Sequence, residues 1–109
     1  MTKNLYTCTA TYDTETLNLT SYKTEVVTFE NRNDWRLVII NRYSQTTQSH
    51  IRKYIKRLRE LCFYLTADLL EQCYKDAVRS KTKLRAMAYN TATGEIILHH
   101  PDLIRDLMF

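Results

Sequence analysis

Residues 46–65, TTQSHIRKYIKRLRELCFYL, constrain the fold most, because their apolar side chains recur at the spacing of an amphipathic α-helix. A Ser or Thr within residues 44–47 can cap its first turn. Such a helix needs a second layer on which to bury its apolar face. The residues expected on that face are Ile51, Tyr54, Ile55, Leu58, Leu61, Cys62 and Leu65.

The residues before this helix have the composition of β-strands. Threonine, tyrosine and β-branched residues predominate, and residues 5–12 alternate in polarity. The Asp13–Thr14 pair and the polar residues 30–34 mark turns, and residues 35–41 (WRLVIIN) form a continuous apolar run. We expect a three-stranded antiparallel meander over residues 5–12, 17–29 and 35–41.

A second helix over residues 67–80 is expected next, capped by Thr66, although one long helix over residues 47–79 is the alternative. A hairpin follows, with strands at residues 81–90 and 95–99 around the only glycine, Gly94. Pro101 suits the first position of a short final helix. The sequence therefore predicts a single α+β domain over residues 1–109, an antiparallel sheet with helices packed on one face and a short C-terminal helix.

Positive charge is concentrated in the middle of the chain. Residues 35–90 carry a net charge of +8, whereas residues 1–34 and 91–109 carry −2 each. Five of the eight positions from 52 to 59 are cationic, and Lys75, Arg79, Lys81, Lys83 and Arg85 form a second group. A cationic surface of this kind favours a polyanionic or acidic partner.

Phe63 and Tyr64 interrupt the apolar pattern. If the helix stays straight they fall on its polar face, so either the helix bends or ends there, or both aromatic rings meet a partner. The residues expected to bind a partner are Gln45, Gln48, Arg52, Lys53, Lys56, Arg57, Arg59, Phe63 and Tyr64.

The motifs of catalysis are missing from the sequence. His50, His99, His100 and the three cysteines form no zinc-binding pattern, and His50 is expected to pack or hydrogen-bond locally. Serine-hydrolase, metalloprotease and phosphate-loop motifs are also lacking. We therefore expect a protein that is not an enzyme, without metal or cofactor.

Cysteine usage and hydropathy indicate a cytoplasmic protein. The cysteines are odd in number and widely spaced, which favours reduced thiols, and Cys62 and Cys73 are expected to pack in the core. We expect neither a signal peptide nor a membrane-spanning segment, because the apolar runs are too short.

Two segments, LTSYKTEVVTF (residues 19–29) and RYSQTTQSHIRKYI (residues 42–55), resemble a small domain common in phage- and plasmid-encoded proteins of Gram-positive bacteria. The resemblance implies a mobile-element accessory protein in a bacterial cell, a class that includes small regulators and inhibitors of host defences. The usual domain ends soon after this helix, whereas this chain continues. The residues that match the pattern are Ser21, Tyr22, Thr24, Val26, Tyr43, Ser44, Thr46, Thr47, His50 and Tyr54.

Three functions stay open at this point. In the first, the basic helix face binds nucleic acid or a host nucleoprotein machine, with Gln45 and Gln48 as hydrogen-bonding groups. Alternatively, an Arg/Tyr surface binds an acidic host protein, as an inhibitor of a bacterial defence system of the anti-CRISPR kind would. In the third, the chain self-associates as a homodimer through an edge strand or residues 61–65.

Overall fold

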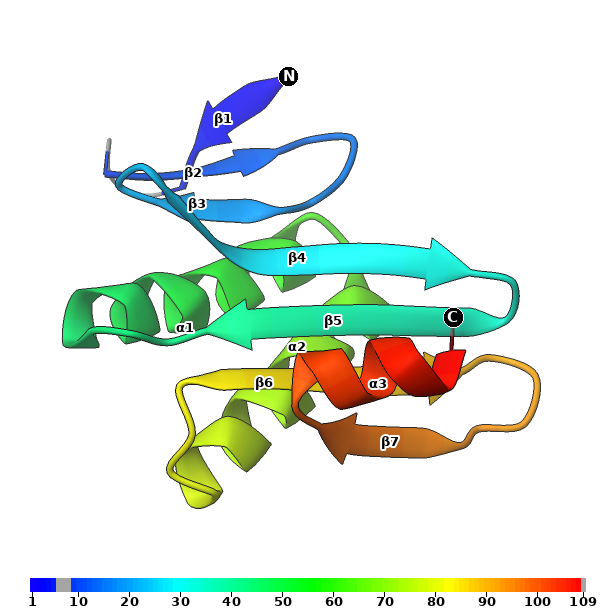
Figure 1. The fold of residues 1–109 in the computed structure, drawn as a ribbon. Helices are drawn as coiled ribbons and strands as arrows, with labels where there is room; N and C mark the ends of the chain where they lie inside the picture. The colour runs from blue at the N-terminus through cyan, green and yellow to red at the C-terminus, as the bar shows by residue number, and fades with distance from the viewer. Residues whose placement is uncertain (6–8, 109) are drawn as a thin grey trace.

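A computed structural model of the chain describes residues 1–5 and 9–108. Within these residues, seven strands form one antiparallel sheet, and each strand lies beside its neighbours in the sequence (Figure 1). The strands are β1 (Thr2–Asn4), β2 (Ala10–Asp13), β3 (Leu19–Ser21), β4 (Thr24–Arg32), β5 (Trp35–Asn41), β6 (Leu84–Asn90) and β7 (Ile96–His99). The helices are α1 (Gln45–Glu60), α2 (Tyr64–Arg79) and α3 (Pro101–Met108).

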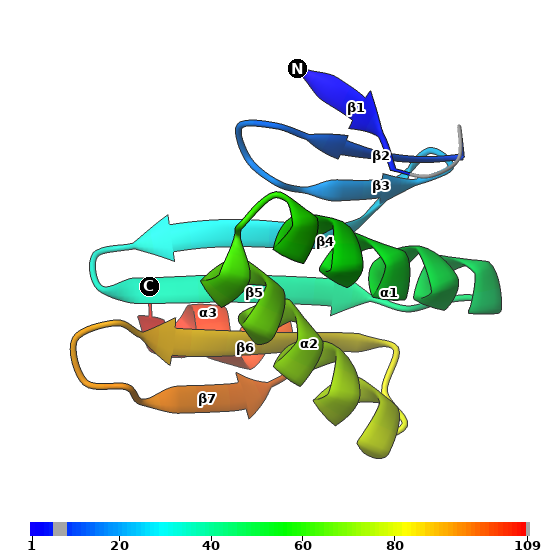
Figure 2. The ribbon, with the colours of Figure 1, turned by 180° about the vertical axis from the view of Figure 1, so that it is seen from behind.

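The sheet is covered on both faces. Helices α1 and α2 form a hairpin between β5 and β6 and pack on one face, as expected, whereas α3 lies on the other (Figures 1 and 2). The side chains of β5 contribute to the apolar core on each face of the sheet, since successive side chains of a strand point to opposite faces. Val38 and Ile40 join the large core under α1 and α2, and Leu37 and Ile39 join Ile104 of α3.

The expected three-stranded N-terminal meander is wrong in detail, because five strands precede α1. The proposed strand over residues 17–29 is divided into β3 and β4 at Tyr22, whose positive φ of 58° reverses the chain. The bounds of the proposed strand over residues 5–12 are also wrong, since Leu5 lies between β1 and β2, and β2 begins at Ala10. Residues 6–8 of that strand lie outside the described residues.

The alternative with two separate helices is correct, and the one with a single long helix over residues 47–79 is wrong. The turn between them is a Schellman motif, in which the N–H of Cys62 donates to Arg59 O at 3.0 Å and that of Phe63 donates to Leu58 O at 2.8 Å. Cys62 has the left-handed conformation, φ 66°, that glycine usually supplies here. Helix α2 begins at Tyr64, so Thr66 lies inside the helix and does not cap it.

The same motif ends α2. Lys81 has a φ of 56°, its N–H donates to Val78 O at 3.1 Å, and the N–H of Thr82 donates to Ala77 O at 3.0 Å. With a single glycine in the chain, other residues adopt the left-handed conformation at these turns. This explains why glycine-based reasoning does not find them.

Tyr54 anchors α1 to the sheet. Its side chain is fully buried, its ring centroid lies 5.4 Å from that of Tyr12, and its hydroxyl donates to Leu17 O at 2.6 Å. Burial raises the pKa of the Tyr54 hydroxyl far above its ordinary value. The hydroxyl therefore stays protonated and ties the middle of α1 to the turn between β2 and β3.

We predict that Tyr54→Phe lowers the free energy of unfolding by about 1 to 2 kcal/mol, because it leaves the carbonyl of Leu17 without this donor. Urea unfolding measures the change. Tyr43→Phe is the matched control and should change nothing, since Tyr43 is exposed. An unchanged midpoint in Tyr54→Phe contradicts the anchoring role.

We predict that Lys81→Gly raises the free energy of unfolding by up to about 1 kcal/mol, because glycine adopts a positive φ without the steric cost of a side chain. Lys83→Gly is the control. Lys83 is exposed and is not among the positive-φ residues, so glycine there should be destabilising. Equal destabilisation by both substitutions would contradict the left-handed conformation of Lys81.

Candidate functional site

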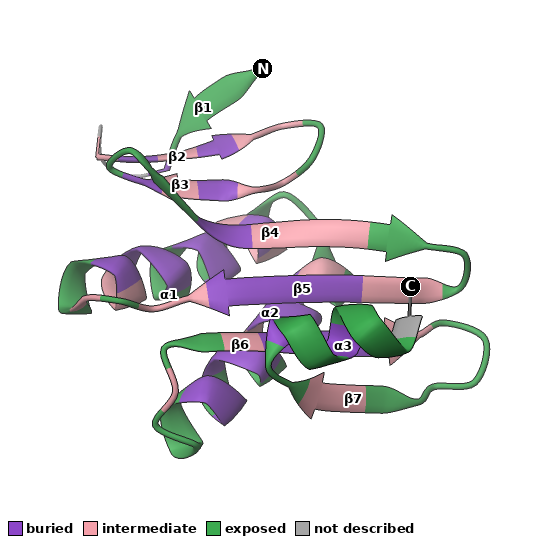
Figure 3. Cartoon of the chain, in the orientation of Figure 1, coloured by how far each residue is buried: buried purple, intermediate pink, exposed green. Residues whose placement is uncertain are grey.

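The cations of α1 do not form one open basic face. Arg52, Lys53 and Lys56 are exposed, whereas Arg57 and Arg59 are half-buried. Figure 3 shows that α1 as a whole contains both buried and exposed residues. Arg57 pairs with Glu60 at 3.6 Å. Arg57 and Arg59, two of the residues expected to bind a partner, therefore also interact within the fold.

Arg59 connects α1 to α2. Its guanidinium donates to Asp68 at 2.9 Å and to Glu71, and Lys75 donates to the other oxygen of Glu71 at 2.9 Å. These bonds from Lys75 and Arg59 hold the pKa of Glu71 below its ordinary value, and Glu71 and Asp68 raise that of Arg59. The network fixes how the two helices lie against each other.

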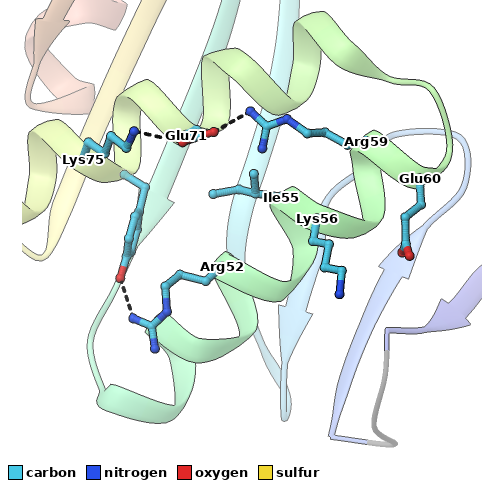
Figure 4. A pocket seen from close by; sticks show the side chains of 8 residues that line it. Arg52, Ile55, Lys56, Arg59, Glu60, Glu71 and Lys75 are labelled. Atoms are coloured by element: carbon cyan, nitrogen blue, oxygen red, sulfur yellow. Dashed lines mark hydrogen bonds and ion pairs between the residues drawn. The ribbon is translucent and has the colours of Figure 1, made fainter.

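A groove of about 570 Å³ runs between α1 and α2 (Figure 4). Ile55 points into it from α1, between a bridge from Arg52 to the Tyr74 hydroxyl at 3.0 Å and the Arg59–Glu71 bridge. Four cations and two carboxylates line it together with Ile55 and Tyr74. The cations are Arg52, Lys56, Arg59 and Lys75, and the carboxylates are Glu60 and Glu71.

The turn between the helices exposes a second surface, which we call the hairpin tip and define as residues 61–65. The exposed fractions are 41% for Leu61, 41% for Phe63, 60% for Tyr64 and 51% for Leu65, and Cys62 is exposed as well. The expectation that Leu61, Cys62 and Leu65 pack in the core is wrong, because α1 ends at Glu60 and the three side chains are exposed at the turn that follows. Phe63 and Tyr64 are exposed because the helix ends.

The two glutamines expected to bind a partner differ in their surroundings. Gln45 is exposed at the first position of α1. Gln48 is half-buried, and its Oε1 accepts from Arg42 at 3.2 Å and from the Tyr74 hydroxyl at 3.4 Å. Gln48 therefore has a role in joining the start of α1 to the end of α2.

The second basic group is divided in the same way. Lys75, Arg79, Lys81 and Lys83 are exposed, with Lys75 bound to Glu71. Arg85 is not a surface cation, since its Nε lies 2.6 Å from Asp76 and both side chains are largely buried. The acidic partners on α2 are what sequence reasoning missed. The spacings of Glu71 to Lys75 and of Asp76 to Arg79 were available signals, whereas the partners of Arg59 and Arg85 lie at longer separations that helix spacing does not indicate.

His50 and Cys73, whose side-chain types often act in catalysis, are buried within the fold. His50 is buried, with Nδ1 2.7 Å from Ser21 Oγ and Nε2 3.4 Å from Thr9 Oγ1. Burial, and then the charge of Lys53, lowers the pKa of His50. Burial raises the pKa of Cys73 to about 12, so this thiol stays protonated.

Over residues 1–5 and 9–108, no three His, Cys, Asp or Glu side chains come together in a group that could hold a metal ion. In the same residues, we find no helix with the length and apolar character needed to cross a membrane.

We predict that the helix hairpin loses stability as the pH falls. Because the folded-state pKa of Glu71 lies below the ordinary 4.5, its contribution is present above that value and is lost as the pH falls through the folded pKa. Glu71→Gln should flatten the dependence of unfolding free energy on pH between about pH 5 and pH 3. Glu95→Gln, at an exposed turn residue, is the control. If Glu71→Gln leaves the pH dependence of the unfolding free energy unchanged, the ion pairs of Glu71 with Arg59 and Lys75 do not stabilise the hairpin.

Comparison with known proteins places the chain in a family. Residues 1–65 match the model of a family of unknown function, DUF8033, which covers β1 to β5, α1 and the hairpin tip. Neither a curated protein nor a solved structure matches the chain significantly. The match contains the ten residues of the phage and plasmid resemblance, and several of these join β3 to α1, as Ser21 does through His50. The chain belongs to the DUF8033 family of unknown function.

Proposed function

We propose that this protein is a non-enzymatic binding protein whose α1–α2 hairpin docks onto another protein. The observation that carries the proposal is the hairpin tip, where Leu61, Phe63, Tyr64 and Leu65 are consecutive or nearly so and all exposed. Contiguous exposed apolar side chains mark interaction sites, and aromatic residues are enriched in the cores of protein interfaces.

The ion pairs of the hairpin favour a protein partner over nucleic acid. Nucleic-acid affinity depends on the number of phosphates that free cations neutralise. Arg57 and Arg59 are paired with carboxylates, which leaves fewer cations to neutralise phosphates. What the hairpin offers is an apolar tip beside a few charges, which is the composition of a protein interface.

The resemblance to phage- and plasmid-encoded proteins gives this binding a biological setting. A mobile-element protein acts in the cytoplasm of its bacterial host, so its partner is a host protein or nucleoprotein machine. Inhibition of a defence system, in the manner of an anti-CRISPR, is the activity of this class that a docking surface without catalytic groups would serve.

Nucleic-acid binding is the second candidate, and a specific observation favours it. Lys53 and Lys56 are exposed on α1, and neither has an ion-pair partner among the residues of the described structure. Lys81 and Lys83 are exposed beyond the end of α2. A DNA or RNA contact through these lysines would weaken steeply with salt, so Lys53→Ala/Lys56→Ala should abolish it.

We predict that the immobilised protein captures a protein from a Gram-positive bacterial lysate, and that nuclease treatment does not release it. Phe63→Ser/Leu65→Ser should reduce capture by about tenfold or more, because these side chains form the apolar centre of the proposed contact. Quantitative mass spectrometry of the retained proteins measures the effect.

Leu103→Ser/Leu107→Ser is the matched control, because it removes two apolar side chains from α3 that are at least about as exposed as Phe63 and Leu65. This variant should capture as the unchanged protein does. Loss of capture on nuclease treatment, or equal loss in both double variants, would refute docking through the hairpin tip.

A further inference from the structure

We propose that the groove between α1 and α2 receives an acidic amphipathic helix of the partner protein. This inference rests on the proposed function and names the chemistry of the partner. Apolar side chains of that helix would lie over Ile55, and its carboxylates would meet Arg52 and Lys56.

The shape of the groove fits two turns of a helix. The Arg52–Tyr74 bridge and the Arg59–Glu71 bridge bound the groove, and Ile55 lies between them (Figure 4). Residues 52 and 59 of one helix are about 10 Å apart along its axis, the rise of about seven residues. A docked helix would therefore present apolar side chains at positions i, i+3 or i+4, and i+7, the pattern of helix-in-groove recognition.

The free charge of the groove selects an acidic helix. Glu71 is already bound by Arg59 and Lys75, and Glu60 pairs with Arg57, so both carboxylates of the groove are neutralised within the fold. Lys56 is exposed and has no ion-pair partner within the described part of the chain. Arg52 uses one of its five N–H donors on Tyr74. These two cations lie four residues apart, the spacing of carboxylates at i and i+4 on a facing helix.

The groove suits nucleic acid less well. The side chain pointing into it is the aliphatic Ile55, and the Tyr74 ring is buried with its hydroxyl already bonded. Base stacking needs an exposed aromatic face, and phosphate binding along a strand needs more free cations than Arg52 and Lys56.

A second copy of the chain offers one acidic amphipathic helix, α3, which exposes Leu103 and Leu107 beside Asp102 and Asp106. However, α3 and the groove lie on opposite faces of the sheet (Figures 1 and 2). A pair of copies could not satisfy both contacts at once, and each addition would leave a free groove and a free helix. Self-association through this contact would therefore be head-to-tail and would build rings or open chains of many copies, and we assign the groove to a different protein.

A peptide-display library tests the inference. Each peptide has about 18 residues in a helical pattern, with apolar residues at one face and an equal mixture of Glu and Lys at the flanking positions. The unchanged protein should enrich Glu-rich peptides, and Arg52→Glu/Lys56→Glu should enrich Lys-rich peptides. The best Glu-rich peptide should lose at least about tenfold in affinity for the double variant.

Lys3→Glu/Lys23→Glu is the control for net charge, since both lysines are exposed on the N-terminal strands and turn, outside the groove. It should select the same peptides as the unchanged protein. Thermal unfolding confirms that each variant is folded, and Lys56→Glu alone replaces the double variant if that one unfolds.

The inference is overturned if Glu-rich peptides are not enriched, if the double variant still selects them, or if the control variant also changes the selection. Concentration-dependent polymers that disappear in Asp102→Lys/Asp106→Lys would assign the groove to a second copy. Unimpaired lysate capture by the groove double variant, with no Glu-rich enrichment, would refute the groove and leave the proposed function intact. Glu-rich enrichment without lysate capture would refute the proposed function alone.

Discussion

The burial of the apolar stripe of α1 is the constraint on which the rest of the structure depends. Ile51, Tyr54 and Leu58 are completely buried beneath the sheet, and the Tyr54 hydroxyl fixes the rotation of the helix through Leu17. Once that face is turned inward, the edge that carries Arg52, Lys56 and Arg59 must line the groove beside α2. The position of the candidate site therefore follows from core packing, and the ion pairs of Arg59 and Lys75 then fix α1 against α2.

Ion pairing then decides what the hairpin can bind. The carboxylates of α2 bind Arg59, so the hairpin is held together by charges that a count of cations would assign to a partner. The chain thereby has fewer free cations than its sixteen lysine and arginine residues indicate. What remains exposed is an apolar tip, an apolar groove floor and a small number of cations, and this combination suits a protein surface better than a phosphate backbone.

The sequence predicted the elements with strong periodicity. The stripe of α1, the apolar run of β5 and the Gly94 turn between β6 and β7 follow from local pattern alone. The left-handed residues Tyr22, Cys62 and Lys81 could not be found in this way. Local sequence rules associate a positive φ with glycine, and none of these three residues is glycine. The error at Cys62 had the largest consequence, since it moved Leu61, Cys62 and Leu65 from the expected core to the surface.

Site-specific photocrosslinking in bacterial cells that produce the protein tests docking through the hairpin most directly. A photoreactive amino acid would replace Tyr64, with an exposed fraction of 60%, and in a separate variant Leu107, with 64%. Our account predicts that position 64 crosslinks to one host protein and that position 107 does not. The account is contradicted if position 64 gives no protein adduct, if it crosslinks to nucleic acid, or if both positions give the same products.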